Sequence, residues 1–178
     1  MPLLEISHPA IDVSLAYATA DNIAGRPLYG DAKALLHLDA HEALMRAAVL
    51  AAAQGMRLRV YDAYRPAAAQ QALWNALPDP TFVADPRKGS AHTRGVAVDL
   101  TLTDATGVPL DMGTGFDEMT PRSFHACTDI PVASLRNRSL LLGTMAAAGW
   151  VHNPREWWHY NLPDPGRYPL IEIMGPSE

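Results

Sequence analysis

Hydrophobic and polar positions along the chain predict a mixture of helices and strands. Residues 38–55 are rich in alanine and leucine, which favour helix, and Gly55 stands where a helix would end. Residues 66–77 begin with a proline, a common first helical residue, and predict a second helix. Residues 134–149 predict a third, ending at a glycine.

The clearest strand is predicted over residues 95–104. Apolar side chains alternate there with small and polar ones, so Val96, Val98, Leu100 and Leu102 face one side and Ala97, Asp99, Thr101 and Thr103 the other. Residues 57–66 alternate toward a proline and predict another strand. Aromatic residues in 150–153 and 157–162 predict two short strands near the C-terminus.

These elements do not repeat as regular strand–helix units. We therefore expect an α+β fold, with a small central antiparallel sheet packed against helices. The 178 residues are enough for one domain with a real core, and we expect residues 1–178 to form a single domain.

Composition narrows the function classes. The net charge of −5, without a basic patch, argues against binding to nucleic acid. No apolar run approaches the roughly 18 to 20 residues that span a bilayer, and the first 15 residues do not read as a signal peptide. Cys127 is the lone cysteine, which fits a reducing cytoplasm. The proline-rich loops are compatible with a homodimer.

Asp99 is the first sign of chemistry, because a buried carboxylate in a strand is costly unless a cation pairs with it. His92 precedes it by seven residues, and Gly95 allows a turn between them. Near the C-terminus, Glu156 and His159 stand three residues apart. His92, Asp99 and His159 would give the three protein ligands of many catalytic zinc sites, with a fourth position for water.

A glutamate that is not a ligand is what a zinc hydrolase needs as its general base, and Glu156 is the candidate. Two neutral imidazoles and one aspartate leave zinc with a net positive charge, which lowers the pKa of water from about 15.7 toward about 7. Arg65 lies at the end of the predicted strand 57–66, where its guanidinium could meet a developing oxyanion.

Each of these candidate residues also has a simpler interpretation. Asp99 could lie at an exposed edge, and Glu156 could form only a surface ion pair with Arg155. His125 and His152 could compete as ligands, His152 more credibly because it follows expected core residues. Cys127 is better explained as a small buried residue than as a nucleophile.

The segments "SAHTRGVAVDLTL", "YDAYRP", "MGTGFDEM" and "EWWHY" together resemble the zinc D-alanyl-D-alanine dipeptidases of the VanX type. The resemblance covers most of the chain. It implies a fold shared with D-Ala-D-Ala carboxypeptidases and the hedgehog signalling domain. The implied reaction is zinc-dependent hydrolysis of D-alanyl-D-alanine to two D-alanines.

The resemblance also implies roles for single residues. His92, Asp99 and His159 match the metal ligands, Glu156 the general base and Arg65 the transition-state clamp. Asp117 matches the carboxylate that receives the free ammonium group of the dipeptide. The weaker matches are Ser90, near the substrate carboxylate, and Tyr17, in the pocket lining. Ala20 departs from the pattern, since an aromatic residue is expected there, and a wider pocket could relax dipeptide specificity.

Two other functions stay open at this point. One is a D,D-carboxypeptidase or another peptidoglycan peptidase on the same scaffold. The other is a non-catalytic, zinc-containing binding module of the hedgehog type, against which Glu156 argues because a structural site has no use for a base. The sequence does not separate antibiotic resistance from recycling of D-Ala-D-Ala.

Overall fold

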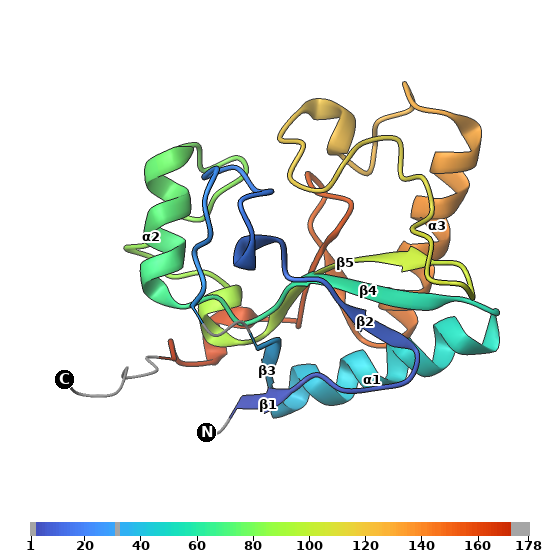
Figure 1. Cartoon of the computed structure of the whole chain (residues 1–178), viewed down its shortest axis with the longest axis horizontal. Helices are drawn as coiled ribbons and strands as arrows, with labels where there is room; N and C mark the ends of the chain where they lie inside the picture. The colour runs from blue at the N-terminus through green and yellow to red at the C-terminus, as the bar shows by residue number, and fades with distance from the viewer. Residues whose placement is uncertain (1–2, 31–32, 172–178) are drawn as a thin grey trace.

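The structure is a computed structural model, and it describes residues 3–30 and 33–171. Figure 1 shows how its α-helices and strands are arranged. In chain order they are β1 (Leu3–Glu5), β2 (Ile11–Val13), β3 (Leu35–His37), α1 (Leu38–Ala53), β4 (Arg57–Asp62), α2 (Ala67–Ala76), β5 (Ala97–Thr103), α3 (Val132–Ala147), β6 (Val151–His152) and β7 (His159–Asn161). The α+β class expected from the sequence is confirmed.

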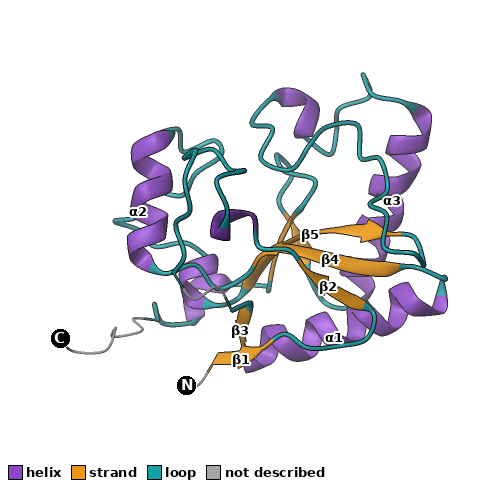
Figure 2. Cartoon of the chain, in the orientation of Figure 1, coloured by secondary structure: helices purple, strands orange, loops and turns teal. Residues whose placement is uncertain are grey.

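The main sheet has five strands in the order β2-β4-β5-β7-β6, and β1 pairs with β3 in a separate two-stranded sheet. Figure 2 shows β2, β4 and β5 of the main sheet side by side. The pairs around β5 and β7 are antiparallel, as expected. β2, however, runs parallel to β4, so the sheet is mixed. The three-residue strands β1, β2 and β3 were not predicted, because they are too short to show an alternating pattern.

The apolar side of the sheet builds the core together with α1 and α3. Leu58, Val60 and Leu100 join the buried alanines of α1 and Leu141 and Met145 of α3 in one cluster. In Figure 1, α1 lies along the lower side of the sheet, whereas α2 stands apart at the left of the view. Two predicted helix ends are confirmed, since Gly55 and Gly149 follow α1 and α3 with positive φ.

The opposite side of the sheet carries a row of polar side chains. Asp99 on β5 lies directly across from His159 on β7. On its other side the register between β4 and β5 shifts by one residue between Val60 and Asp62, which brings Asp62 opposite Asp99. Directly paired residues present their side chains on the same face. The row Asp62–Asp99–His159 therefore depends on that local irregularity, which skips Tyr61.

Candidate active site

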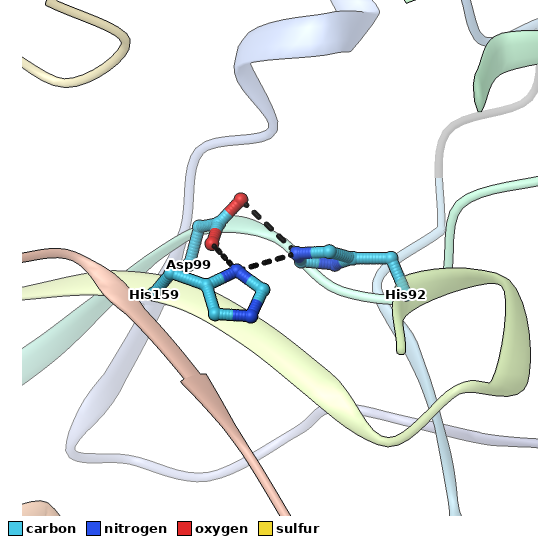
Figure 3. A group of neighbouring side chains, drawn as sticks. All are labelled: His92, Asp99 and His159. Carbon is cyan, nitrogen blue, oxygen red and sulfur yellow. Dashed lines mark hydrogen bonds and ion pairs between the residues drawn. The ribbon is translucent and has the colours of Figure 1, made fainter. Parts of the chain in front are cut away.

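The three predicted metal ligands converge from different parts of the fold. His92 lies in a short 3₁₀ turn, Asp99 in β5 and His159 at the start of β7, and their side chains point toward one another (Figure 3). The Nε2 atom of His92 lies 3.1 Å from Nδ1 of His159 and 3.3 Å from Oδ2 of Asp99. Nδ1 of His159 lies 3.0 Å from Oδ1 of Asp99.

The chemistry and spacing of these atoms fit a divalent metal ion. Ligand atoms bound tetrahedrally to zinc lie about 3.3 Å apart, close to the three separations seen here. His92 is held with Nδ1 2.7 Å from the carbonyl oxygen of Ala63. An Nδ1–H donated to that carbonyl leaves the Nε2 lone pair free for a metal. In the described part of the chain, this is the one group of three or more candidate ligands that is close enough to hold an ion.

The rival histidines lie elsewhere. His125 and His152 contact each other, with ring centroids 4.9 Å apart, and neither belongs to the three-residue group. Every residue of β5 is buried, and Asp99 is only 2% exposed. Asp99 is therefore not an exposed edge residue. Although burial opposes it, the positive charge of His92 in its protonated form and the hydrogen bond with His159 lower the pKa of Asp99 below its ordinary value.

A cavity of about 190 Å³ opens beside this group. Its lining includes Glu156, Asp117, Arg65, Tyr17 and Ser90, so all five predicted catalytic and substrate-binding residues border the same space as the three ligands. Apolar side chains complete the wall, among them those of Ile23, Leu73, Phe82, Val83, Met119 and Trp158. Ala20 is exposed and is not among the residues that line the cavity, and its effect on dipeptide specificity stays a prediction.

Glu156 is 5% exposed, with its Oε2 atom 3.8 Å from Nδ1 of His159. Burial raises the pKa of this carboxyl to about 7, against the opposing effect of the His159 charge. It does not pair with Arg155 or another surface base. A carboxyl with such a pKa can take up and release a proton near neutral pH.

Asp117 offers a second buried carboxylate. Its Oδ1 atom accepts a hydrogen bond of 3.0 Å from the hydroxyl of Tyr17, whereas its Oδ2 atom is buried without a partner. Burial, aided by the charge of Asp99, raises the pKa of Asp117 to about 7. Its backbone is left-handed, at φ 59°, a conformation that few residues other than glycine adopt. An unpaired buried oxygen beside a cavity calls for a donor from a ligand.

Arg65 is fixed by residues that the sequence did not assign. Its Nε and Nη2 atoms donate to Oδ2 of Asp62, at 2.9 and 2.7 Å, and Nη1 donates to Gln70 at 3.0 Å. These contacts take three of the five guanidinium N–H groups, and Nη2 also lies 3.5 Å from Oδ2 of Asp99. The guanidinium also lies over the ring of Tyr17, 4.9 Å from its centroid. The only hint of Asp62 in the sequence is its spacing of three residues from Arg65.

Ser90 is engaged locally. The Thr93 hydroxyl can donate to the carbonyl of Ser90, and the hydroxyl oxygens of Ser90 and Thr93 lie 3.0 Å apart, within hydrogen-bond distance in either direction. The Ser90 hydroxyl oxygen also accepts from the Thr93 amide. The substrate role of Ser90 stays a prediction.

The buried charges around the cavity are unequal. Asp62, Asp99 and Glu156 are buried, Asp117 is half-buried with its Oδ2 atom buried, and Arg65 is the buried guanidinium beside these four carboxyl groups. Buried carboxylates without cations are strongly penalised. The site therefore favours cationic ligands, and His92, Asp99 and His159 could hold a divalent metal ion.

A three-ligand metal group with a spare buried glutamate, at the side of a cavity, is the arrangement of a metal-dependent hydrolase. The family model described as D-ala-D-ala dipeptidase matches residues 2–172, and the chain belongs to this family. The protein is a peptidase, as the sequence predicted.

Several relatives support the assignment. A D-alanyl-D-alanine dipeptidase of Escherichia coli (strain K12) is 48% identical over 168 residues, which cover 94% of this chain and 87% of the relative. Proteins with the same description from Enterococcus faecium and Streptomyces coelicolor are each 36% identical. These matches cover 83% and 85% of this chain, and 84% and 87% of the relatives.

Among the described residues, no helix combines the length and the apolar character that a bilayer crossing requires.

Proposed function

We propose that the protein hydrolyses the dipeptide D-alanyl-D-alanine to two D-alanines, with zinc held by His92, Asp99 and His159 and with Glu156 as general base. The convergence of these four side chains on one cavity carries the proposal. When bound, zinc would supply Lewis acidity, which polarises a peptide carbonyl and lowers the pKa of water. Ligand type favours zinc among divalent ions.

Glu156 would take the proton from the attacking water and pass it to the leaving amine. Its buried carboxyl, with a pKa of about 7, suits both steps near neutral pH. Arg65 would stabilise the negative charge that develops on the substrate carbonyl oxygen. Although burial opposes it, the charge of Asp62 raises the pKa of Arg65, so the guanidinium stays charged.

Asp117 would bind the free ammonium group of the dipeptide through its unpartnered Oδ2. A peptide that lacks a free amine would leave this oxygen buried and unpaired, which costs about 1–3 kcal/mol or more. The cavity would thereby select a dipeptide over the end of a longer chain.

The remaining expectations belong to the same proposal. Residues 1–178 would act as one domain in the cytoplasm, where a lone Cys127 needs no disulfide partner. The partner would be a small dipeptide, and the enzyme would need neither nucleic acid nor membrane. A homodimer is compatible with this function.

The first test compares free D-Ala-D-Ala with its N-acetylated form, using ninhydrin to detect new amines and metal analysis of the purified protein. We expect about one zinc per chain, rapid cleavage of the free dipeptide and a kcat/KM about a hundredfold lower for the acetylated one. Equal cleavage of both would indicate a D,D-carboxypeptidase. Zinc without turnover of either would indicate a binding module.

A second test replaces Asp117 with asparagine, which tolerates the left-handed backbone. The neutral amide cannot pair with an ammonium group as a carboxylate does. We expect the KM for D-Ala-D-Ala to rise at least tenfold and the preference over the acetylated dipeptide to shrink. Steady-state kinetics measure both, and a thermal melt checks that folding is intact. An unchanged KM would show that the amine binds elsewhere.

A further inference from the structure

Asn153 lies where the turn that carries both Glu156 and His159 begins. Its backbone N–H donates to the carbonyl of His159 at 3.0 Å, and its carbonyl accepts from the Glu156 amide at 3.3 Å. Pro154, the next residue, fixes its own φ and stiffens the turn. The position of Asn153 is thus set by the same turn that presents the candidate base.

The side-chain oxygen and nitrogen of Asn153 bind different partners. Its Oδ1 atom accepts from the backbone N–H of Arg155 at 3.0 Å, which makes an Asx turn. Because this bond fixes the amide plane, the Nδ2 atom is aimed at Glu156 and donates to its Oε2 at 2.8 Å. Asn153 also lines the cavity.

Glu156 has few other restraints on its carboxyl group. Among the described residues, Asn153 is the one hydrogen-bond donor to this carboxylate, and Nδ1 of His159 is farther away at 3.8 Å. A glutamate side chain has three rotatable bonds, so its donors decide where the two oxygens lie. With Oε2 held by Asn153, Oε1 is left without a hydrogen-bond partner in the described part of the chain.

We propose that Asn153 is a positioning residue, which holds Oε2 of Glu156 and so keeps this carboxylate beside His159, where it can take a proton from the reacting water. This inference rests on the proposed role of Glu156 as general base. Asn153 does not itself exchange a proton with substrate. It acts through the orientation of Glu156, and its loss lowers the rate of proton transfer without removing a ligand of the metal or a contact with the dipeptide.

The decisive variant is Asn153→Ser. A serine hydroxyl can still accept from the Arg155 amide and keep the turn, but it is too short to reach Glu156 at the same time. We expect kcat on D-Ala-D-Ala to fall at least tenfold, with KM changed less than twofold and with zinc content and melting temperature retained. Asn153→Asp also keeps the turn but sets a carboxylate against Glu156, and we expect a larger loss of kcat.

The matched control is Asp104→Ser. Asp104 makes a turn of the same kind, in which its Oδ1 atom accepts from the Thr106 amide at 2.8 Å and also from the Thr106 hydroxyl and the Val108 amide, and it does not line the cavity. This variant should keep full activity, which separates damage to a turn from loss of the contact with Glu156.

Crystal structures of the wild type and Asn153→Ser give a readout that does not depend on turnover. We expect the Glu156 carboxylate to leave its place beside His159 in the variant. An unmoved carboxylate, or a kcat equal to that of the wild type, would overturn the role of Asn153. A wild-type protein that leaves D-Ala-D-Ala intact would contradict the proposed function instead, while the two structures would still decide what Asn153 does.

Discussion

Replacing Glu156 with glutamine is expected to lower kcat on D-alanyl-D-alanine by about 10²- to 10⁴-fold, the usual contribution of a general base. Glutamine has the same size, and its carbonyl oxygen can still accept from the Asn153 amide, but it cannot take up a proton. Zinc content and KM should stay close to those of the wild type, because Glu156 is not among the metal-ligand group. Steady-state kinetics and metal analysis of the same preparation test both statements.

Glu42→Gln is the matched control, since Glu42 is exposed on α1 and should tolerate the change. Full activity of Glu156→Gln would refute the mechanism and leave the buried glutamate as a structural residue. Loss of zinc from this variant would instead make Glu156 part of the metal site.

Replacing His92 with alanine is expected to abolish both zinc retention and turnover. The change removes one of the three proposed ligands, and the loss of a residue that only orients a ligand already costs about 10–100-fold in metal affinity. Binding also links zinc to folding, because an ion at 100 times its Kd stabilises the native state by about 2.7 kcal/mol. That increment, measured as the rise in melting temperature when zinc is added back after chelation, should disappear in His92→Ala.

His152→Ala is the control for this prediction. His152 was the rival ligand in the sequence, but in the structure it is exposed and lies against His125. Its replacement should leave the zinc-dependent rise in melting temperature intact. If His152→Ala lost zinc while His92→Ala retained it, the assignment of the ligands would be wrong.

Much of the fold could be predicted because its longer elements carry strong patterns. The helices α1, α2 and α3 and the strand β5 show the periodicity or the end signals of their type over ten or more residues of sequence. The short strands β1 to β3 show none, since three residues cannot display an alternation. Their pairing, including the parallel contact of β2 with β4, depends on tertiary packing.

The residues of the candidate site likewise fall into those that the sequence could predict and those that it could not. His92, Asp99, Glu156 and His159 could be named because metal chemistry requires particular residue types at recognisable spacings. Asp62 could not, because its place opposite Asp99 follows from a register shift that skips Tyr61 and has no clear mark in the sequence. Gln70 and Asn153 have ordinary sequence contexts, and only their contacts with Arg65 and Glu156 reveal a role.

Asp99 and His159 face each other across neighbouring strands although sixty positions of sequence separate them. Side chains alternate between the two faces, so sliding β7 by a single residue would turn the imidazole of His159 away from the carboxylate. A metal ion held by residues of both strands would therefore bind only when the two strands are correctly aligned. Its binding energy would then stabilise that alignment during folding. Metal bound during folding would then favour the correct strand register as well as complete the active site.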